Sequence, residues 1–309
     1  MISVVIPVFN EEESLVELHR DIVRNIKNLD TNYEVIFVDD GSTDNSLEIL
    51  KETATKDKKV KVYSFRKNQG KAEALTFGFE KAKGDYIVTL DADLQDNPLE
   101  IPHIIAKLKE GYDHVSGWRM NRKDKGAKRI FSRLFNSSVS FIFGFKLHDY
   151  NCGLKGYTKE SAISLRLYGG LHRFIPLLLH QEGFRVCEIP VSHSERRYGK
   201  SKFGISKVWK DLPDMFTMIF LIKYGKRPLH FFGYVGGVII VIGFFVLTYL
   251  VILHFEGRVI GRRPLLLLGM LLMLGGIQVF FTGFLADLII NTSHKQNKKF
   301  LLKYSSTDQ

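Results

Sequence analysis

The stretch YIVTLDADLQ, residues 86–95, decides the fold class of this chain. Its first five residues predict a buried β-strand, and Asp91 and Asp93 follow where that strand ends. Two carboxylates one residue apart, with the amide of Gln95 two residues further on, are hard oxygen ligands of the kind that bind Mg²⁺ or Mn²⁺. Because Asp-x-Asp is also common in turns, the preceding strand is what makes this motif a candidate metal site.

Strands and helices alternate on both sides of this motif. We expect strands at residues 2–8, 33–38, 60–65, 86–90 and 113–117, with helices at 11–29, from about 44, at 70–82 and after Asn97–Pro98. This order predicts an α/β domain with a mainly parallel central sheet that helices cover on both faces. Ligands of such sheets bind at the carboxyl ends of the strands, so one cleft should collect Asn10, Asp39 and Asp91.

Two further polar motifs at strand ends each allow two interpretations. Asp39–Asp40–Gly41–Ser42 either accepts hydrogen bonds from a nucleoside or forms the turn that caps the next helix, and Asn10–Glu11 has the same ambiguity. The chain has no GxGxxG after its first strand and no GxxxxGKS/T, which argues against a dinucleotide site and a P-loop.

Two apolar stretches near the C-terminus, residues 231–253 and 264–286, contain no Asp, Glu, Lys, Arg or His. At about 1.5 Å per residue, either one spans the roughly 30 Å hydrocarbon core of a bilayer as a helix. The alternative is an apolar hairpin buried inside a large domain. We expect two transmembrane helices that follow one soluble domain.

The net charge of +11 would suit a nucleic-acid partner, but basic residues gather beside the apolar stretches. They are Lys207, Lys210, Lys223, Lys226 and Arg227 before the first stretch, and Lys295, Lys298, Lys299 and Lys303 after the second. Such residues favour the cytoplasmic side, although Arg258, Arg262 and Arg263 in the connecting loop point the other way. Two cysteines without CxxC also fit a reduced compartment. We therefore expect the soluble domain and both termini in the cytoplasm, and no nucleic-acid partner.

On this basis the chain divides into a domain at 1–205, an amphipathic juxtamembrane helix at 206–228, a two-helix hairpin at 229–290 and a basic tail at 291–309. Within the first domain, a stretch at about 128–147 is apolar enough to lie on a membrane surface, or to form an ordinary core helix. Small residues on the spans fit either the hairpin itself or a contact in a homo-oligomer. These small residues are Gly233, Gly236, Gly237, Gly275 and Gly276.

Several motifs, taken in order, carry a resemblance to a known family. VIPVFNE at 5–11, VDDGSTD at 38–44, NQG at 68–70 with AKGDY at 82–86, and DADLQD at 91–96 with Pro98 resemble family 2 glycosyltransferases of the GT-A fold. GWR at 117–119, HDYNCGLK at 148–155, RYGKSK at 197–202 and the two spans resemble the polyprenyl-phosphate subgroup. That subgroup includes dolichol-phosphate mannose synthases and GtrB-type and ArnC-type enzymes. The QxxRW element of processive polysaccharide synthases is absent, which disfavours polymer synthesis.

The resemblance implies a role for each matching residue. Pro7, Asn10, Glu11 and Asp39 match positions that hold the nucleoside, and Asp91, Asp93 and Gln95 match the metal and diphosphate site. Arg119, Arg133 and Ser137 match positions that hold the lipid phosphate. Arg197, Ser201 and Lys202 lie in a loop that resembles one closing over the donor diphosphate. Asp149 resembles an acidic position that is sometimes given a catalytic role; the other interpretation is a turn residue.

The implied activity is inverting transfer of a hexose from UDP-glucose or another UDP-hexose to undecaprenyl or another polyprenyl phosphate, for modification of a cell-envelope glycan or glycolipid. The implied cofactor is Mg²⁺ or Mn²⁺, and the implied partners are the nucleotide-sugar, the lipid phosphate and the bilayer. GDP-mannose is the second donor, and a soluble acceptor is the second acceptor. Outside the enzymes, the alternative is a non-catalytic, membrane-tethered scaffold that binds a nucleotide-sugar.

Overall fold

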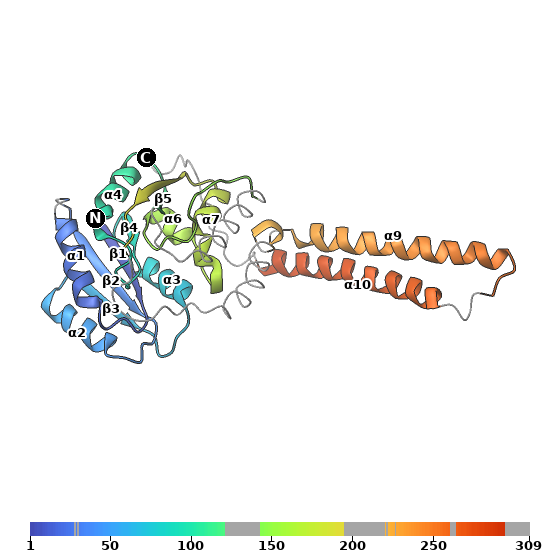
Figure 1. The fold of residues 1–309 in the computed structure, drawn as a ribbon, viewed down its shortest axis with the longest axis horizontal. Coiled ribbons are helices and arrows are strands. Elements are labelled where there is room, and N and C mark those ends of the chain that lie inside the picture. The colour runs from blue at the N-terminus through green and yellow to red at the C-terminus, as the bar shows by residue number, and fades with distance from the viewer. Residues whose placement is uncertain are drawn as a thin grey trace. The chain divides into compact units, whose positions relative to one another are not determined.

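The computed structural model describes residues 1–27, 29, 31–120, 143–194, 220, 222–225, 227–259 and 264–293 (Figure 1). The chain forms two compact units, Met1–Asp211 and Leu212–Gln309. The first unit holds a central sheet flanked by helices, and the second holds two long helices.

Seven strands make one sheet in the described part of the first unit, in the order β3-β2-β1-β4-β6-β5-β7. β1 pairs in parallel with β2 and β4, β2 with β3, and β5 with β7. β6 runs antiparallel to both β4 and β5. The predicted α/β domain with a mainly parallel sheet is therefore confirmed. The strands are β1 (Ile2–Val8), β2 (Tyr33–Asp39), β3 (Val60–Ser64), β4 (Tyr86–Thr89), β5 (His114–Arg119), β6 (Lys155–Thr158) and β7 (Val186–Val191).

Helices cover both faces of this sheet, which is why β1 and β2 are mainly apolar and are buried nearly along their whole length. On one face, a core that includes Ile6, Leu18 and Ile104 joins β1 to α1 and α4. On the other face, α3 lies so close to β1 that a Cβ added to Gly78 would stand 2.3 Å from Val5. The helices are α1 (Leu15–Lys27), α2 (Ser46–Lys56), α3 (Lys71–Lys81), α4 (Ile101–Lys109), α6 (Lys159–Ser164) and α7 (Ile175–Gln181), with 3-10 helices η1 (Pro98–Glu100) and η2 (Gly169–Arg173).

The expected elements up to residue 117 are present with shifted ends. The helix expected at 11–29 begins at Leu15, because the residues before it form a turn in which Ser14 N donates to Glu11 O at 3.1 Å. Asn97 caps η1 as expected, since its side chain accepts a hydrogen bond from Leu99 N. The sequence analysis did not predict β6, β7, α6 and α7.

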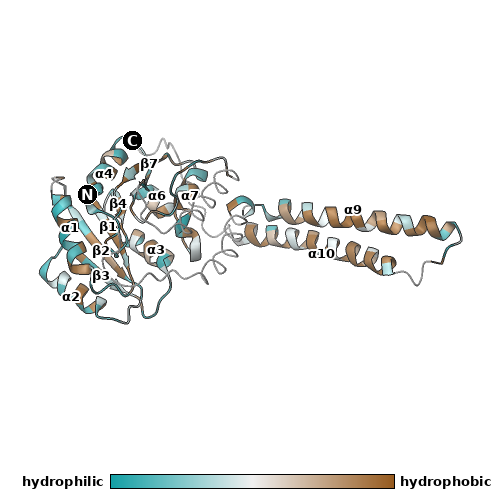
Figure 2. Ribbon diagram, in the orientation of Figure 1, coloured by the Kyte–Doolittle hydropathy of each residue, from teal (hydrophilic) through white to brown (hydrophobic). Residues whose placement is uncertain are grey.

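The second unit contains α9 (Pro228–Phe255) and α10 (Pro264–Ser293). Both helices are long and apolar enough to cross a membrane. Figure 2 shows apolar residues along both helices, and large side chains such as Tyr234 and Leu274 are 76% and 67% exposed. This pattern fits helices solvated by lipid and does not fit the core hairpin of a soluble domain.

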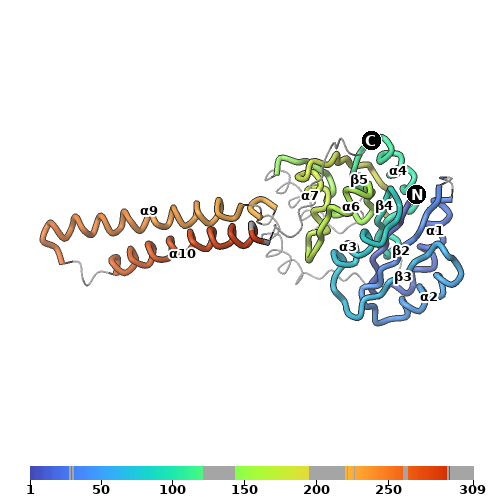
Figure 3. Tube along the Cα trace, turned by 180° about the vertical axis from the view of Figure 1, so that it is seen from behind, coloured from blue at the N-terminus to red at the C-terminus, as the bar shows by residue number. Residues whose placement is uncertain are grey.

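Glycines make the close contact between these two helices, which run side by side (Figure 3). A Cβ added to Gly236 would stand 2.7 Å from both Gly276 O and Phe280 N. By contrast, a Cβ added to Gly237 or Gly275 would meet no atom of the described residues within 4 Å. Gly236 and Gly276 therefore pack within the hairpin, whereas Gly237 and Gly275 face away from the contact between the two helices.

We predict that Gly236→Leu weakens the hairpin, because the new side chain must separate two backbones in contact. The free energy of unfolding should fall by about 1–3 kcal/mol, which is the usual cost of overpacking. Unfolding of the purified full chain in mixed detergent micelles measures it. Gly237→Leu is the matched control, because its side chain enters open space. Equal loss in both variants would contradict this packing.

Candidate active site

Hydrogen bonds join the loops after β1, β2 and β4 at the carboxyl edge of the sheet. Asn10 adopts a left-handed φ of 54°, and its Oδ1 accepts a hydrogen bond from Thr43 N at 2.7 Å. Ser14 Oγ donates to Ala92 O at 2.6 Å, which ties the first loop to the Asp-x-Asp loop. Three strand ends are thus held as one polar edge.

The residues predicted to hold a nucleoside lie along this edge. Pro7 is half-buried in β1, and the backbone N of Glu11 donates to Ser46 Oγ at 3.0 Å. Asp39 ends β2 with its side chain buried, and its carboxylate accepts a hydrogen bond from Ser64 Oγ at 2.6 Å. Their contact with a nucleoside stays a prediction.

Asp40, unlike its neighbour Asp39, binds the backbone of the loop before α3. Its two carboxylate oxygens accept hydrogen bonds from Gln69 N at 2.7 Å and Gly70 N at 2.9 Å. Burial raises the pKa of Asp40, and these backbone bonds only partly offset that effect. Because α3 begins directly after Gly70, Asp40 fixes where Lys71 lies.

The Asp-x-Asp loop carries its first carboxylate against a cation. Lys71 forms an ion pair with Asp91. Burial alone would raise the pKa of Asp91, but the ammonium groups of Lys71 and Lys155 outweigh it and hold that pKa below its usual value. Because its pKa is lowered, Asp91 is ionised at neutral pH. Asp93 Oδ1 accepts a hydrogen bond from the backbone N of Gln95 at 3.2 Å, which closes a short turn.

A third carboxylate, Asp96, lies beside this loop, and the sequence analysis gave it no role. It is buried, and a Cβ added to Gly153 would stand 2.5 Å from Asp96 Oδ2 and 2.8 Å from Asp91 Oδ1. Burial and the charge of Asp91 raise the pKa of Asp96 to about 7, although the nearby Arg119 lowers it. Only glycine at 153 leaves room for both carboxylates.

Arg119 and Asp149 form a bidentate ion pair, with Nε–Oδ2 at 2.6 Å and Nη2–Oδ1 at 3.1 Å. Arg119 Nη2 also donates to Asn151 O at 3.1 Å. Burial lowers the pKa of the guanidinium, but the bonds to Asp149 outweigh it and hold that pKa above its ordinary value. The side chains are 12% and 4% exposed, so each charge is held mainly by the other.

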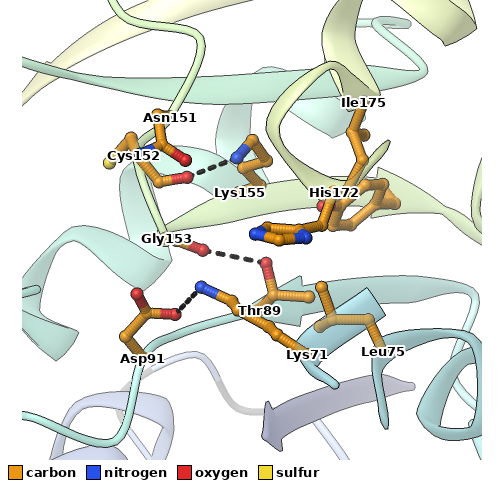
Figure 4. Close-up of a pocket in the computed structure, with 11 residues that line it drawn as sticks. Lys71, Leu75, Thr89, Asp91, Asn151, Cys152, Gly153, Lys155, His172 and Ile175 are labelled. Carbon is orange, nitrogen blue, oxygen red and sulfur yellow. Dashed lines mark hydrogen bonds and ion pairs between the residues drawn. The ribbon is translucent and has the colours of Figure 1, made fainter. Parts of the chain in front are cut away.

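Asp91 forms part of the wall of a small polar pocket (Figure 4). Its polar lining consists of Lys71, Thr89, Asp91, Asn151, Lys155, Tyr157 and His172, with Leu75, Cys152, Gly153 and Ile175 completing the wall. The buried Lys155 ammonium donates to Cys152 O, and Thr89 Oγ1 donates to Gly153 O at 3.0 Å. Burial lowers the pKa of Lys155 to about 8.

Five predicted site residues, Arg133, Ser137, Arg197, Ser201 and Lys202, lie outside the described residues. Most of the 128–147 stretch and most of 206–224 lie outside them as well. Their contacts with a lipid phosphate, a donor diphosphate or a membrane surface stay predictions.

Four residues of the site, Lys71, Asp96, Lys155 and Ser14, were not predicted from the sequence. A signal was present for Asp96 and Lys71, because one lies inside the DADLQD motif and the other directly follows NQG. Lys155 is a charged residue at a buried position of β6, which only the strand assignment reveals. Ser14 acts through an oxygen 78 residues away in sequence, so no local pattern marks it.

A mainly parallel sheet with an Asp-x-Asp loop after β4 and polar loops after β1 and β2 defines a GT-A nucleotide-diphospho-sugar transferase fold. The family model described as Glycosyl transferase family 2 matches residues 3–166. The chain belongs to glycosyl transferase family 2.

Curated relatives of this chain are named for polyprenyl-phosphate substrates. A dodecaprenyl-phosphate galacturonate synthase from Rhizobium johnstonii is 35% identical, over 96% of this chain and 89% of that protein. An undecaprenyl-phosphate 4-deoxy-4-formamido-L-arabinose transferase from Proteus mirabilis is 38% identical, over 82% of this chain and 76% of that protein.

Among solved structures, the fold resembles glucosyl-3-phosphoglycerate synthase from Mycobacterium tuberculosis in complex with Mn²⁺ and UDP-glucose. The TM-score is 0.55 with 18% identity, over 71% of this chain and 78% of that one. This likeness shows a shared fold.

We predict that Asp96 makes stability fall as pH rises. Its folded pKa of about 7 lies above the value near 4 of an unfolded aspartate, so the folded state binds the extra proton between these values. Without metal, Asp96→Asn should therefore be more stable than the parent protein at pH 8, by up to about 4 kcal/mol, with a smaller difference at pH 5. Thermal unfolding in EDTA measures this. Glu52→Gln, on the exposed side of α2, is the control and should show no such trend.

Proposed function

We propose that this protein transfers a sugar from a nucleotide-sugar to the phosphate of a polyprenyl lipid. The observation that carries the proposal is that the Asp-x-Asp loop and the Arg119–Asp149 pair lie in one site. Asp91 and the buried Asp96 both lie against Gly153, and the charges of Asp91 and Arg119 both act on Asp96. The Asp-x-Asp loop suits a diphosphate with a metal, and Arg119 offers a fixed cation to a second phosphate. The two membrane-length helices and the names of the relatives support a lipid acceptor.

The donor set of the acidic loop fits Mg²⁺ or Mn²⁺. Asp91 is ionised and already engages a cation, Lys71. Within the described residues, no group of three or more His, Cys, Asp or Glu is placed to hold a metal alone. Asp91 and Asp93, with the Gln95 amide, would therefore supply part of the ligand set, and donor phosphates the rest, as is usual for Mg²⁺. A bound cation would neutralise charge on the diphosphate leaving group. The Mn²⁺ and UDP-glucose bound by the structural neighbour support this role.

The acceptor explains why the site needs no strong base. The second ionisation of a phosphate monoester lies near pH 6, so a lipid phosphate is largely a dianion at neutral pH. One of its oxygens attacks the anomeric carbon while the bond from that carbon to the diphosphate breaks, which inverts the configuration. The chain contributes orientation and charge, through Arg119 toward the phosphate and Lys71 near the diphosphate.

Asp149 acts on this reaction through Arg119. Both of its oxygens accept hydrogen bonds from that guanidinium, and one also accepts from Asn151 N at 3.1 Å. A carboxylate held in this way is poorly placed to take a proton from an acceptor. We therefore assign Asp149 as a positioning residue rather than a general base.

Finer features of the function rest on the sequence resemblance. The resemblance alone favours UDP-glucose or another UDP-hexose as donor, with GDP-mannose second. The relatives differ in sugar, galacturonate in one and 4-deoxy-4-formamido-L-arabinose in another. We further propose that the domain of residues 1–205 and both termini lie in the cytoplasm, as the basic residues beside the spans indicate.

The first test is product formation with Asp93 changed. Purified full chain with undecaprenyl phosphate, Mg²⁺ and a panel of UDP- and GDP-sugars should give a lipid-linked sugar with at least one donor. We expect Asp93→Ala or EDTA to lower the rate at least 100-fold, because charge on the leaving group is no longer neutralised.

The negative outcomes separate the alternatives. Nucleotide binding without turnover, unchanged by Asp93→Ala, would support the scaffold. Product on a water-soluble acceptor but none on the lipid would support a soluble-acceptor transferase. Glu52→Gln on α2 is the control for this assay, since it changes an exposed carboxylate far along the chain from the site.

The second test addresses Asp149. We predict that Asp149→Asn raises the KM for the lipid phosphate at least tenfold and changes the KM for the donor little, because Arg119 loses the partner that fixes it. Glu188→Gln is the matched control, since Glu188 pairs with His148 in the same region. A loss confined to kcat, with the acid limb of the parent's pH profile disappearing in the variant, would instead indicate a general base.

A further inference from the structure

Lys155 is a buried cation that no carboxylate of the described residues contacts directly, although the charges of Asp149 and Asp91 act on it from a distance. Its side chain lies in β6 and the residue is 4% exposed. Its one recorded hydrogen bond goes to a neutral main-chain oxygen, Cys152 O, and the described residues give it no ion pair. An ammonium has three N–H donors, so at least two remain for a ligand. Burying such a group without a counter-charge is costly, which points to a function.

The acidic residue in the lining of the pocket, Asp91, is already engaged. Asp91 pairs with Lys71, and it is also the residue that we assign to the metal and diphosphate. Lys71 and Lys155 together carry two positive charges, against the single negative charge of Asp91 in the lining. Once Asp91 serves a metal, the pocket keeps an excess of positive charge.

The rest of the lining is neutral and suited to hydroxyl groups. His172 Nδ1 lies 3.1 Å from Gly169 O, and since a carbonyl only accepts, Nδ1 must be the donor. Burial and the charge of Lys71 lower the pKa of His172 to about 3, so its Nε2 is an unprotonated acceptor at neutral pH. Figure 4 shows the imidazole reaching into the space that Lys155 and Lys71 also face.

We propose that this pocket receives one end of the transferred sugar and that Lys155 binds a carboxylate there, so that the donor class is a nucleotide-linked uronic acid. The proposal rests on the proposed function, because it takes the diphosphate to lie at Asp91 and Asp93. The sugar attached to that diphosphate is then next to the pocket, since Asp91 belongs to both. A carboxylate on the sugar supplies the directly bonded counter-charge that Lys155 lacks, and a neutral hexose would leave the ammonium bonded to neutral groups only.

Two other roles for Lys155 would predict different behaviour. If it only holds the Cys152 carbonyl in place, its charge matters to folding and not to the choice of sugar. If it binds the donor diphosphate, it acts on every nucleotide alike, including free UDP. Binding measurements with matched sugars therefore separate all three roles.

The experiment measures affinity of the full chain, in detergent with Mg²⁺, for UDP, UDP-glucose and UDP-glucuronate, and for the pair UDP-galactose and UDP-galacturonate. Each pair differs only in a CH₂OH or a COO⁻ at the sixth carbon. We expect the parent protein to bind one uronate at least tenfold more tightly than its neutral partner. Lys155→Met should abolish that preference and leave the affinity for UDP within about twofold.

Two variants make the result decisive. Lys155→Gln keeps a polar group and serves in place of Lys155→Met if that protein does not fold, as judged by its melting temperature. Lys159→Met removes an exposed lysine at the start of α6 and should keep the preference, which excludes a general effect of charge.

Equal affinities within both sugar pairs would overturn the proposal, as would a parallel loss for UDP itself in Lys155→Met. Either result leaves the proposed function standing, because that function is judged by lipid-linked product in the separate assay. Absence of UDP binding would overturn both the uridine donor and the uronate assignment.

Discussion

The crowding of carboxylates at the end of β4 is the constraint on which the rest of the site depends. Asp91, Asp93 and Asp96 lie within six residues of chain, and Asp96 is buried. Like charges this close disfavour one another's ionisation. Lys71 offsets this repulsion by pairing with Asp91, and Arg119 lowers the pKa of Asp96, which nevertheless stays at about 7. Such an arrangement is unfavourable for stability alone, and it suits a loop that receives a cation with its diphosphate.

The antiparallel strand β6 brings the second half of the site to this loop. Because β6 pairs with β4 and β5, the segment just before it crosses the carboxyl edge of the sheet. That segment supplies Asp149 to Arg119 and the bare backbone of Gly153 to the carboxylates, while β6 itself begins with Lys155. Thr89 Oγ1 and Gly117 N bond to the backbone of this segment, so its position is set from β4 and β5. One insertion into the sheet therefore positions both the Arg119–Asp149 pair and the pocket lined by Lys155.

The sequence predicted β1, β2 and β4 because these strands are buried along most of their length and are mainly apolar. β6 was not predicted because it is four residues long and begins with a lysine and a glycine. β7 was not predicted because it contains Glu188 and Pro190. In the site, Asp91 and Arg119 were predicted from motifs. Asp149 was predicted as well, but its pairing with Arg119 was not, and Lys71 was missed. The partners lie 30 and 20 residues apart in sequence, and such pairings depend on tertiary packing.

The hairpin is held together by means that suit a lipid environment. Between helices in lipid, apolar side chains gain nothing from leaving the solvent, so close packing must supply the contact. Gly236 and Gly276 provide it by letting backbones touch, while Thr248 and Thr282 bond back to their own helices at 2.8 Å. Since the chain of a polyprenyl acceptor stays in the bilayer, a tether of this kind keeps the transferase in the phase that holds its substrate. On the proposed function, the reactive phosphate would reach the catalytic domain by diffusion along the membrane surface, at a far higher effective concentration than in bulk water.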